Sequence, residues 1–61
     1  MNEKIDVWEL KRGERFKLPT EYNMPNDVFV FDHMDGMYCF AKSESDGRIL
    51  NWCGPVERVT Q

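Results

Sequence analysis

The fold is decided by residues 28–42, which read VFVFDHMDGMYCFAK. β-branched and aromatic residues fill the runs on both sides of Met34-Asp35-Gly36, and such residues are enriched in strands. An Asp-Gly dipeptide between two runs of this kind is a strong signal for a tight hairpin turn. The stretch is therefore predicted to be an antiparallel β-hairpin, and the other segments are placed around it.

The register of this hairpin decides which side chains share a face. A two-residue loop at Asp35-Gly36 puts one group on one face (Phe29, Phe31, His33, Tyr38 and Phe40) and a second group on the other (Val28, Val30, Met37, Cys39 and Ala41). Both groups are rich in apolar side chains, which a single open sheet cannot leave in water. The sheet is expected to curl into a barrel covered by the remaining segments, or to pair with another copy.

A second Asp-Gly turn precedes a third run, residues 48–53. It fits either a two-residue type I′ turn or a three-residue turn at Ser45-Asp46-Gly47, and the choice shifts the register by one residue. The three-residue version pairs Phe40 with Trp52, Lys42 with Leu50 and Cys39 with Cys53.

The flanking segments are shorter. Residues 14–18 alternate polar with apolar, which predicts a half-buried strand with Phe16 and Leu18 pointing inward. Ile5–Leu10 fits a short strand or a single helical turn, and we favour the strand. Residues 56–59 are predicted to form a short closing strand, and no helical periodicity of useful length is present.

Length and composition restrict the function. Sixty-one residues make one domain, over residues 1–61, and a chain of this size buries only about 60% of its unfolded surface. Its eight Phe, Trp and Tyr residues suffice for a small barrel but not for a deep, enclosed active site. A net charge of −3 argues against a general nucleic-acid binder.

The cellular location is predicted from what the sequence lacks. No apolar run approaches the roughly 20 residues of a membrane span, and the first residues, Met1 to Lys4, do not open a signal peptide. We expect a cytoplasmic protein. In that compartment Cys39 and Cys53 are expected to be reduced thiols, with a redox pair as the alternative.

The order of these signals resembles the small SH3-like barrels. Residues 10–16 are followed by a long loop, three meandering strands and a short strand after Gly54-Pro55, and the likeness is closest to short accessory proteins of bacteriophages and bacteria. The resemblance implies a five- to six-stranded antiparallel barrel with a central meander. It also implies a protein-binding module, of the kind by which phages alter a host protein.

Candidate contact residues lie in the long loop and among the tryptophans. The segment from Pro19 to Asp27 has loop composition, and long loops on small domains are frequent binding sites. Tyr22 and Met24 within it either cap the core or contact a partner. Trp8 and Trp52 are suited to anchor an interface, although at least one must belong to the core.

The alternative function is nucleic-acid binding. The cationic residues Lys11, Arg12, Arg15 and Lys17 form the main basic cluster and lie near Trp8 and Phe16 in sequence. Cations can hold a phosphate backbone while an aromatic ring stacks on a base. The same cations are also explained as charges that protect a strand edge from aggregation.

A metal-binding or catalytic site near the first turn has less support from the sequence. Asp32, His33, Asp35 and Cys39 are residue types that bind transition metals, but their spacing matches no metal signature. His33 is the only histidine, and no Gly-x-Ser-x-Gly nucleophile motif is present. We expect no catalytic site, metal or cofactor, and predict a non-catalytic protein-binding module that can act as a homodimer.

Overall fold

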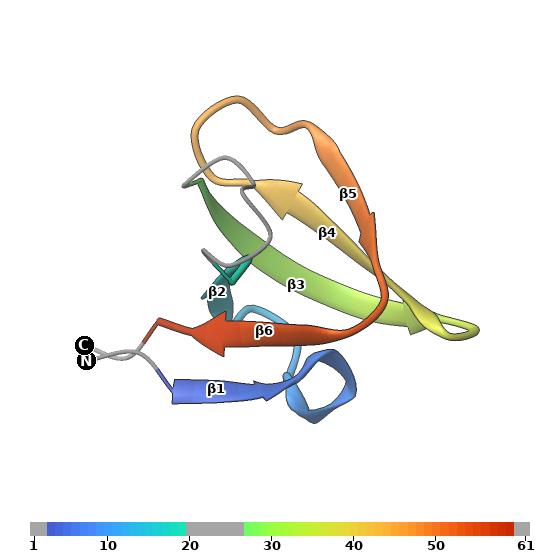
Figure 1. The fold of residues 1–61 in the computed structure, drawn as a ribbon. Helices are drawn as coiled ribbons and strands as arrows, with labels where there is room; N and C mark the ends of the chain where they lie inside the picture. Colours follow the sequence, from blue (N-terminus) through green and yellow to red (C-terminus); the bar gives the residue numbers. More distant parts are fainter. Residues whose placement is uncertain (1–2, 20–26, 60–61) are drawn as a thin grey trace.

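The described residues, 3–19 and 27–59, form a single antiparallel sheet in the computed structural model (Figure 1). The elements are β1 (Glu3–Asp6), the 3₁₀ helix η1 (Val7–Glu9), β2 (Arg15–Lys17), β3 (Val28–Asp35), β4 (Tyr38–Ser43), β5 (Ile49–Trp52) and β6 (Pro55–Arg58). Across the sheet the order is β1-β6-β2-β3-β4-β5. The predicted all-β class, antiparallel pairing and central meander are confirmed. Among the described residues the sheet is not closed, because β1 and β5 remain as its two edges.

The N-terminal segment combines a strand with a helical turn. The strand predicted over Ile5–Leu10 is wrong in its second half, because β1 ends at Asp6 and η1 follows. The Asp6 N–H donates to Glu9 Oε2 at 3.1 Å, and the Leu10 N–H donates to the Val7 carbonyl at 3.2 Å. This three-residue spacing brings Val7 and Leu10 together in the core.

The alternation predicted for residues 14–18 is confirmed by β2. Phe16 and Leu18 are buried, Arg15 just before Phe16 is exposed, and Lys17 between the two buried residues is only partly buried. Phe16 lies opposite Phe29 of β3 on one side and Arg58 of β6 on the other. Phe16 thus lies where β2 joins the β3-β4-β5 meander on one side to the β1-β6 pair on the other.

The turn of the first hairpin lies one residue later than predicted. Asp35 pairs with Tyr38, so the two-residue loop is Gly36-Met37 and not Asp35-Gly36. Gly36 has a φ of +67°, a left-handed conformation that glycine adopts without steric cost.

A β-bulge at Asp32 then changes the faces of β3. Phe31 lies opposite Ala41, but His33 lies opposite Phe40, so Asp32 is an extra residue on the bulged strand. Phe31 therefore points into the core and His33 points outward. The single face predicted for five of the hairpin residues is wrong, since it divides between the core (Phe29 and Phe31) and the outer surface (His33, Tyr38 and Phe40).

The second hairpin has a four-residue loop, Glu44–Gly47. The Ser43 N–H donates to the Arg48 carbonyl at 2.8 Å, and the Arg48 N–H donates to the Asp46 carboxylate at 3.1 Å. Both shorter turns considered from the sequence are wrong, because the Asp46 carboxylate and Gly47, at φ +76°, close a longer loop. The observed partners are Phe40 with Asn51, Lys42 with Ile49 and Cys39 with Trp52.

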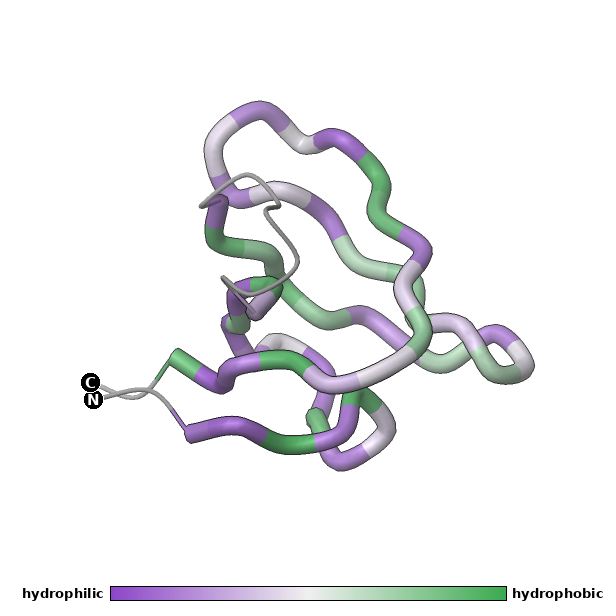
Figure 2. The backbone as a smooth tube through the Cα atoms, viewed as in Figure 1, coloured by the Kyte–Doolittle hydropathy of each residue, from purple (hydrophilic) through white to green (hydrophobic). Residues whose placement is uncertain are grey.

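The core lies inside the curled sheet, where apolar segments of the chain converge (Figure 2). Its buried apolar members are Val7, Leu10, Phe16, Leu18, Phe29, Phe31, Cys39, Ala41 and Val56. The strands between the edges each supply at least one of them, whereas β1 and β5 supply only partly buried side chains, Ile5, Leu50 and Trp52. Within residues 3–19 and 27–59, no helix has the length and apolar character needed to cross a membrane.

Candidate protein-binding face

The outward-facing side chains of β3, β4 and β5 form one surface, which we call the meander face. Directly opposed residues of antiparallel strands share a side of the sheet. The register therefore sets three rows next to each other: Val30, Lys42 and Ile49; His33, Phe40 and Asn51; Asp35 and Tyr38. Tyr38 and Ile49 are 51% and 50% exposed, and Phe40 between their rows is partly exposed. The centre of the meander face is thus aromatic and aliphatic.

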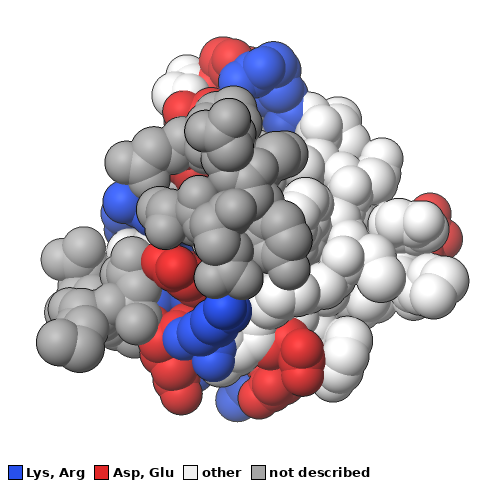
Figure 3. Space-filling model, viewed as in Figure 1, with Lys and Arg blue, Asp and Glu red and all other residues white. Residues whose placement is uncertain are grey.

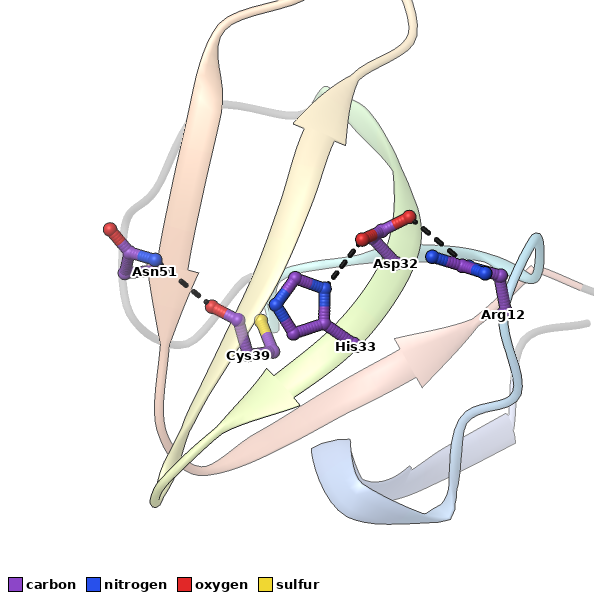
Figure 4. A network of polar contacts seen from close by, with 5 residues as sticks. All are labelled: Arg12, Asp32, His33, Cys39 and Asn51. Atoms are coloured by element: carbon purple, nitrogen blue, oxygen red, sulfur yellow. Dashed lines mark hydrogen bonds and ion pairs between the residues drawn. The ribbon is translucent and has the colours of Figure 1, made fainter.

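The bulge positions a polar network at one margin of this face (Figure 4). Arg12 Nε donates to Asp32 Oδ1 at 3.3 Å, and Asp32 Oδ2 lies 2.5 Å from His33 Nδ1. The hydrogen bond from His33, and then that from Arg12, hold the pKa of Asp32 below its usual range. The His33 ring stacks on Phe40, with centroids 5.1 Å apart and planes 14° from parallel.

This network orients two flat rings at the surface. The Asp32 carboxylate fixes one edge of the imidazole, and the Phe40 ring supports its face. The His33 ring forms its hydrogen bond with Asp32. In the described part of the chain, no group of three His, Cys, Asp or Glu residues is arranged to hold a metal. The geometry holds His33 and Phe40 together at the surface.

The two cysteines differ in exposure. Cys39 is buried, and burial raises the pKa of its thiol, while Cys53 is exposed. The side-chain amide of Asn51 donates to the Cys39 carbonyl at 3.2 Å (Figure 4). The three-residue turn would set Cys39 opposite Cys53, but Cys39 pairs with Trp52, and both cysteines are free thiols.

Charge is distributed unevenly over the molecule (Figure 3). Charged side chains gather around β1 and η1 and near the loop between β4 and β5, whereas the side that carries β5 is largely uncharged. Exposed apolar residues are Trp8 on η1, Met37 in the hairpin turn, Tyr38 on β4 and Ile49 on β5. Three of these four belong to the β3–β5 meander and its turn.

Comparison with protein-family models, with curated proteins and with solved structures found no match. The meander face is therefore interpreted from its own geometry and chemistry.

The predicted contact residues have different environments. Trp8 is 61% exposed on η1. Trp52 is half-buried against the core, and its indole N–H donates to the Pro55 carbonyl at 3.0 Å, which connects β5 to β6. Tyr22 and Met24 lie outside the described residues.

The two arginines of the basic cluster are paired with acidic side chains. Arg12 forms an ion pair with Asp32, and Arg15 forms one with Glu44, each at 3.3 Å. The other predicted members are Lys11 and Lys17, on either side of them in sequence. Carboxylates beside the two arginines weaken the positive potential that would attract a phosphate backbone.

Sequence reasoning missed Tyr38, Phe40 and Ile49 as surface residues. It assigned Tyr38 and Phe40 to the same face as Phe31, because the alternation was continued through Asp32. The sequence contained a signal for the bulge, because Asp32-His33 is a polar pair inside an otherwise apolar strand. A bulge at such a point changes the direction of the side chains that follow it.

Proposed function

We propose that this chain is a non-catalytic protein-binding module built on a small SH3-like barrel, and that the meander face contacts the partner. The observation that carries the proposal is the half exposure of Tyr38 and Ile49 on either side of the stacked His33 and Phe40 rings. Interface centres are depleted in charge and enriched in aromatic residues.

The SH3-like part of the proposal is supported by the strand order. The three-stranded meander is followed by β6, which returns to pair with β2. This agrees with the order of signals on which the resemblance to phage and bacterial accessory proteins rests. By the same resemblance, the partner we propose is a host protein.

The test is a pull-down from host-cell lysate with the wild-type chain and a Tyr38→Ala/Ile49→Ala variant. Both side chains are half exposed, so the double variant is expected to fold. We expect the wild-type chain to retain a discrete protein after nuclease treatment, and the variant to lose at least about tenfold of it, as for central interface residues. Retention of the same protein by the variant would contradict the meander face as the contact.

Two controls separate the alternatives. Lys4→Ala changes an exposed residue on β1, away from the meander in the sheet order, and should leave capture unchanged. Capture that is lost on nuclease treatment and at high salt would favour nucleic-acid binding through the basic cluster instead. Trp8→Ala and Tyr22→Ala report separately on two of the four contact residues predicted from the sequence.

A further inference from the structure

Strand β5 ends the sheet with an open edge. It pairs with β4 on one side, and among the described residues no strand pairs with its other side (Figure 1). Its sequence, Ile49-Leu50-Asn51-Trp52, contains no charged residue and no proline. Natural sheets usually blunt an open edge with charges, proline or a bulge, because unpaired backbone groups recruit further strands.

The hydrogen-bond pattern shows which backbone groups of β5 face the open edge. In an antiparallel ladder, residues that bond to one neighbour alternate with residues that point away from it. The Ser43 N–H donates to the Arg48 carbonyl, so Arg48 and Leu50 direct their backbone groups toward β4. Ile49 and Asn51 therefore direct their N–H and C=O groups to the open edge.

We propose that β5 pairs in antiparallel fashion with β5 of a second copy of this chain, with Leu50 on the two-fold axis. In this register Ile49 of each copy lies opposite Asn51 of the other, and each of these pairs exchanges both backbone hydrogen bonds. Residues 49 and 51 also point to the same outer side, so the two meander faces become one continuous surface. The pairing is independent of the function proposed above.

Charge favours a second copy as the occupant. Each chain carries a net charge of −3, so two copies repel unless they approach through neutral surface. The side that carries β5 is largely uncharged (Figure 3). Because β5 itself has no charged residue, pairing of two β5 strands brings no like charges of these strands together. The β1 edge does not allow this, because it carries Glu3, Lys4 and Asp6.

The area limits the strength of the pairing. A stable interface takes about 800 Å² from each partner, and the described surface of this small chain totals 4112 Å². A four-residue ladder with the side chain of Ile49 covers less than that. We therefore expect a dimer with a dissociation constant in the micromolar range or weaker.

The register is tested by mixed disulfide cross-linking in a Cys53→Ser background. An Ile49→Cys chain and an Asn51→Cys chain should form a covalent heterodimer on oxidation, because opposed Cα atoms lie about 5.5 Å apart. Each variant alone should not cross-link, since like positions lie about 8 Å apart. Cross-linking of Asn51→Cys with itself, or none in the mixture, would overturn this pairing.

The association itself is tested by sedimentation over protein concentrations up to about 1 mM, where a weak dimer forms. The wild-type mass should rise from 7.3 kDa toward twice that value. Ile49→Lys should stay monomeric, while Met37→Lys, which adds the same charge at an exposed turn residue, should behave as wild type. A wild-type chain that is monomeric throughout, or equal behaviour of the two lysine variants, would overturn the proposal.

Discussion

The two edges of the sheet, β1 and β5, are built differently. β1 reads Glu-Lys-Ile-Asp and places charged side chains along its length, whereas β5 reads Ile-Leu-Asn-Trp and carries none. Each edge supplies only partly buried residues to the core, so their packing roles are alike. The two edges are therefore alike in burial and differ in charge, and charged side chains are a common protection of a sheet edge from further pairing.

The neighbours of the two edges extend this contrast. At β1, Glu3 pairs with Arg58 of β6 at 3.2 Å, and Arg58 also reaches Glu14 at 3.5 Å. Beyond its pairing with β4, β5 packs Leu50 and Trp52 against the core, and the side chains of Asn51 and Trp52 donate to the carbonyls of Cys39 and Pro55. The β1 edge thus includes ion pairs, whereas these contacts of β5 involve no charged side chain.

The largest expected effect comes from Phe16→Ala, which tests whether both edges belong to one cooperative unit. Phe16 is fully buried between β3 and β6, so its loss should cost about 3–5 kcal/mol. A core of this size supplies roughly that much, so we expect a largely unfolded chain by circular dichroism and urea titration. Phe40→Ala, on the meander face, is the milder control. Amide protection that disappears from β1 but persists in β5 would separate the two edges into independent units.

Gly54→Ala addresses the joint between the two halves, because Gly54 connects β5 to β6 and accepts a hydrogen bond from the Val7 N–H. Gly54 has a φ of +135°, and an added Cβ would have room, with Trp52 Nε1 3.8 Å away. The cost is therefore backbone strain, about 1–3 kcal/mol in urea denaturation. Gly36→Asn is the control, since asparagine tolerates the φ of +67° found there. A loss below about 0.5 kcal/mol for Gly54→Ala would contradict this assignment.

Neutralising β1 tests the contrast directly. In an Ile49→Lys background, the changes Glu3→Gln, Lys4→Gln and Asp6→Asn remove the charges of the other edge. We expect concentration-dependent association to return by sedimentation, with less than about 1 kcal/mol of lost stability per exposed charge. If the neutral variant remains monomeric at about 1 mM, charge is not what keeps β1 unpaired.

The smallest expected effect is the dependence of stability on acid pH through Asp32. The pKa of Asp32 is lowered, so its contribution to stability is present above the unfolded value near 3.9 and disappears as the pH falls through the folded value. Asp32→Asn should lower the melting temperature at pH 7, and its difference from wild type should shrink as the pH falls through the folded pKa. Asp35→Asn on the same strand is the control. If the difference in melting temperature between wild type and Asp32→Asn grew toward low pH, it would contradict a stabilising role for the Asp32 carboxylate.

The sequence was sufficient for much of the fold. The alternation around Phe16, the two apolar runs and the Asp-Gly turns predicted the strands and the meander, because period-two burial leaves a direct trace in residue order. Turn lengths were not predictable to one residue, since Asp-Gly fits several loops. The bulge at Asp32 then divided residues that a regular strand would keep on one face.

The candidate site was less predictable for the same reason. Which side of a strand faces water depends on register, and a shift of one residue exchanges the faces. Tyr38 and Ile49 were therefore missed as exposed, although both lie in runs assigned correctly as strands. Trp8, proposed as a contact from its residue type, is exposed on η1, and its role stays a prediction.

The position of β6 has a consequence for biosynthesis. β6 lies between β1 and β2, yet it is made after both of them. A growing chain can form the local meander β3-β4-β5 early, because its pairings span few residues. Until Pro55–Arg58 has left the ribosome, β1 has no strand to pair with, and β2 has only β3. β1 thus stays unpaired until β6 has been made, and the meander, with its neutral β5 edge, is exposed to neighbouring chains before the sheet is complete.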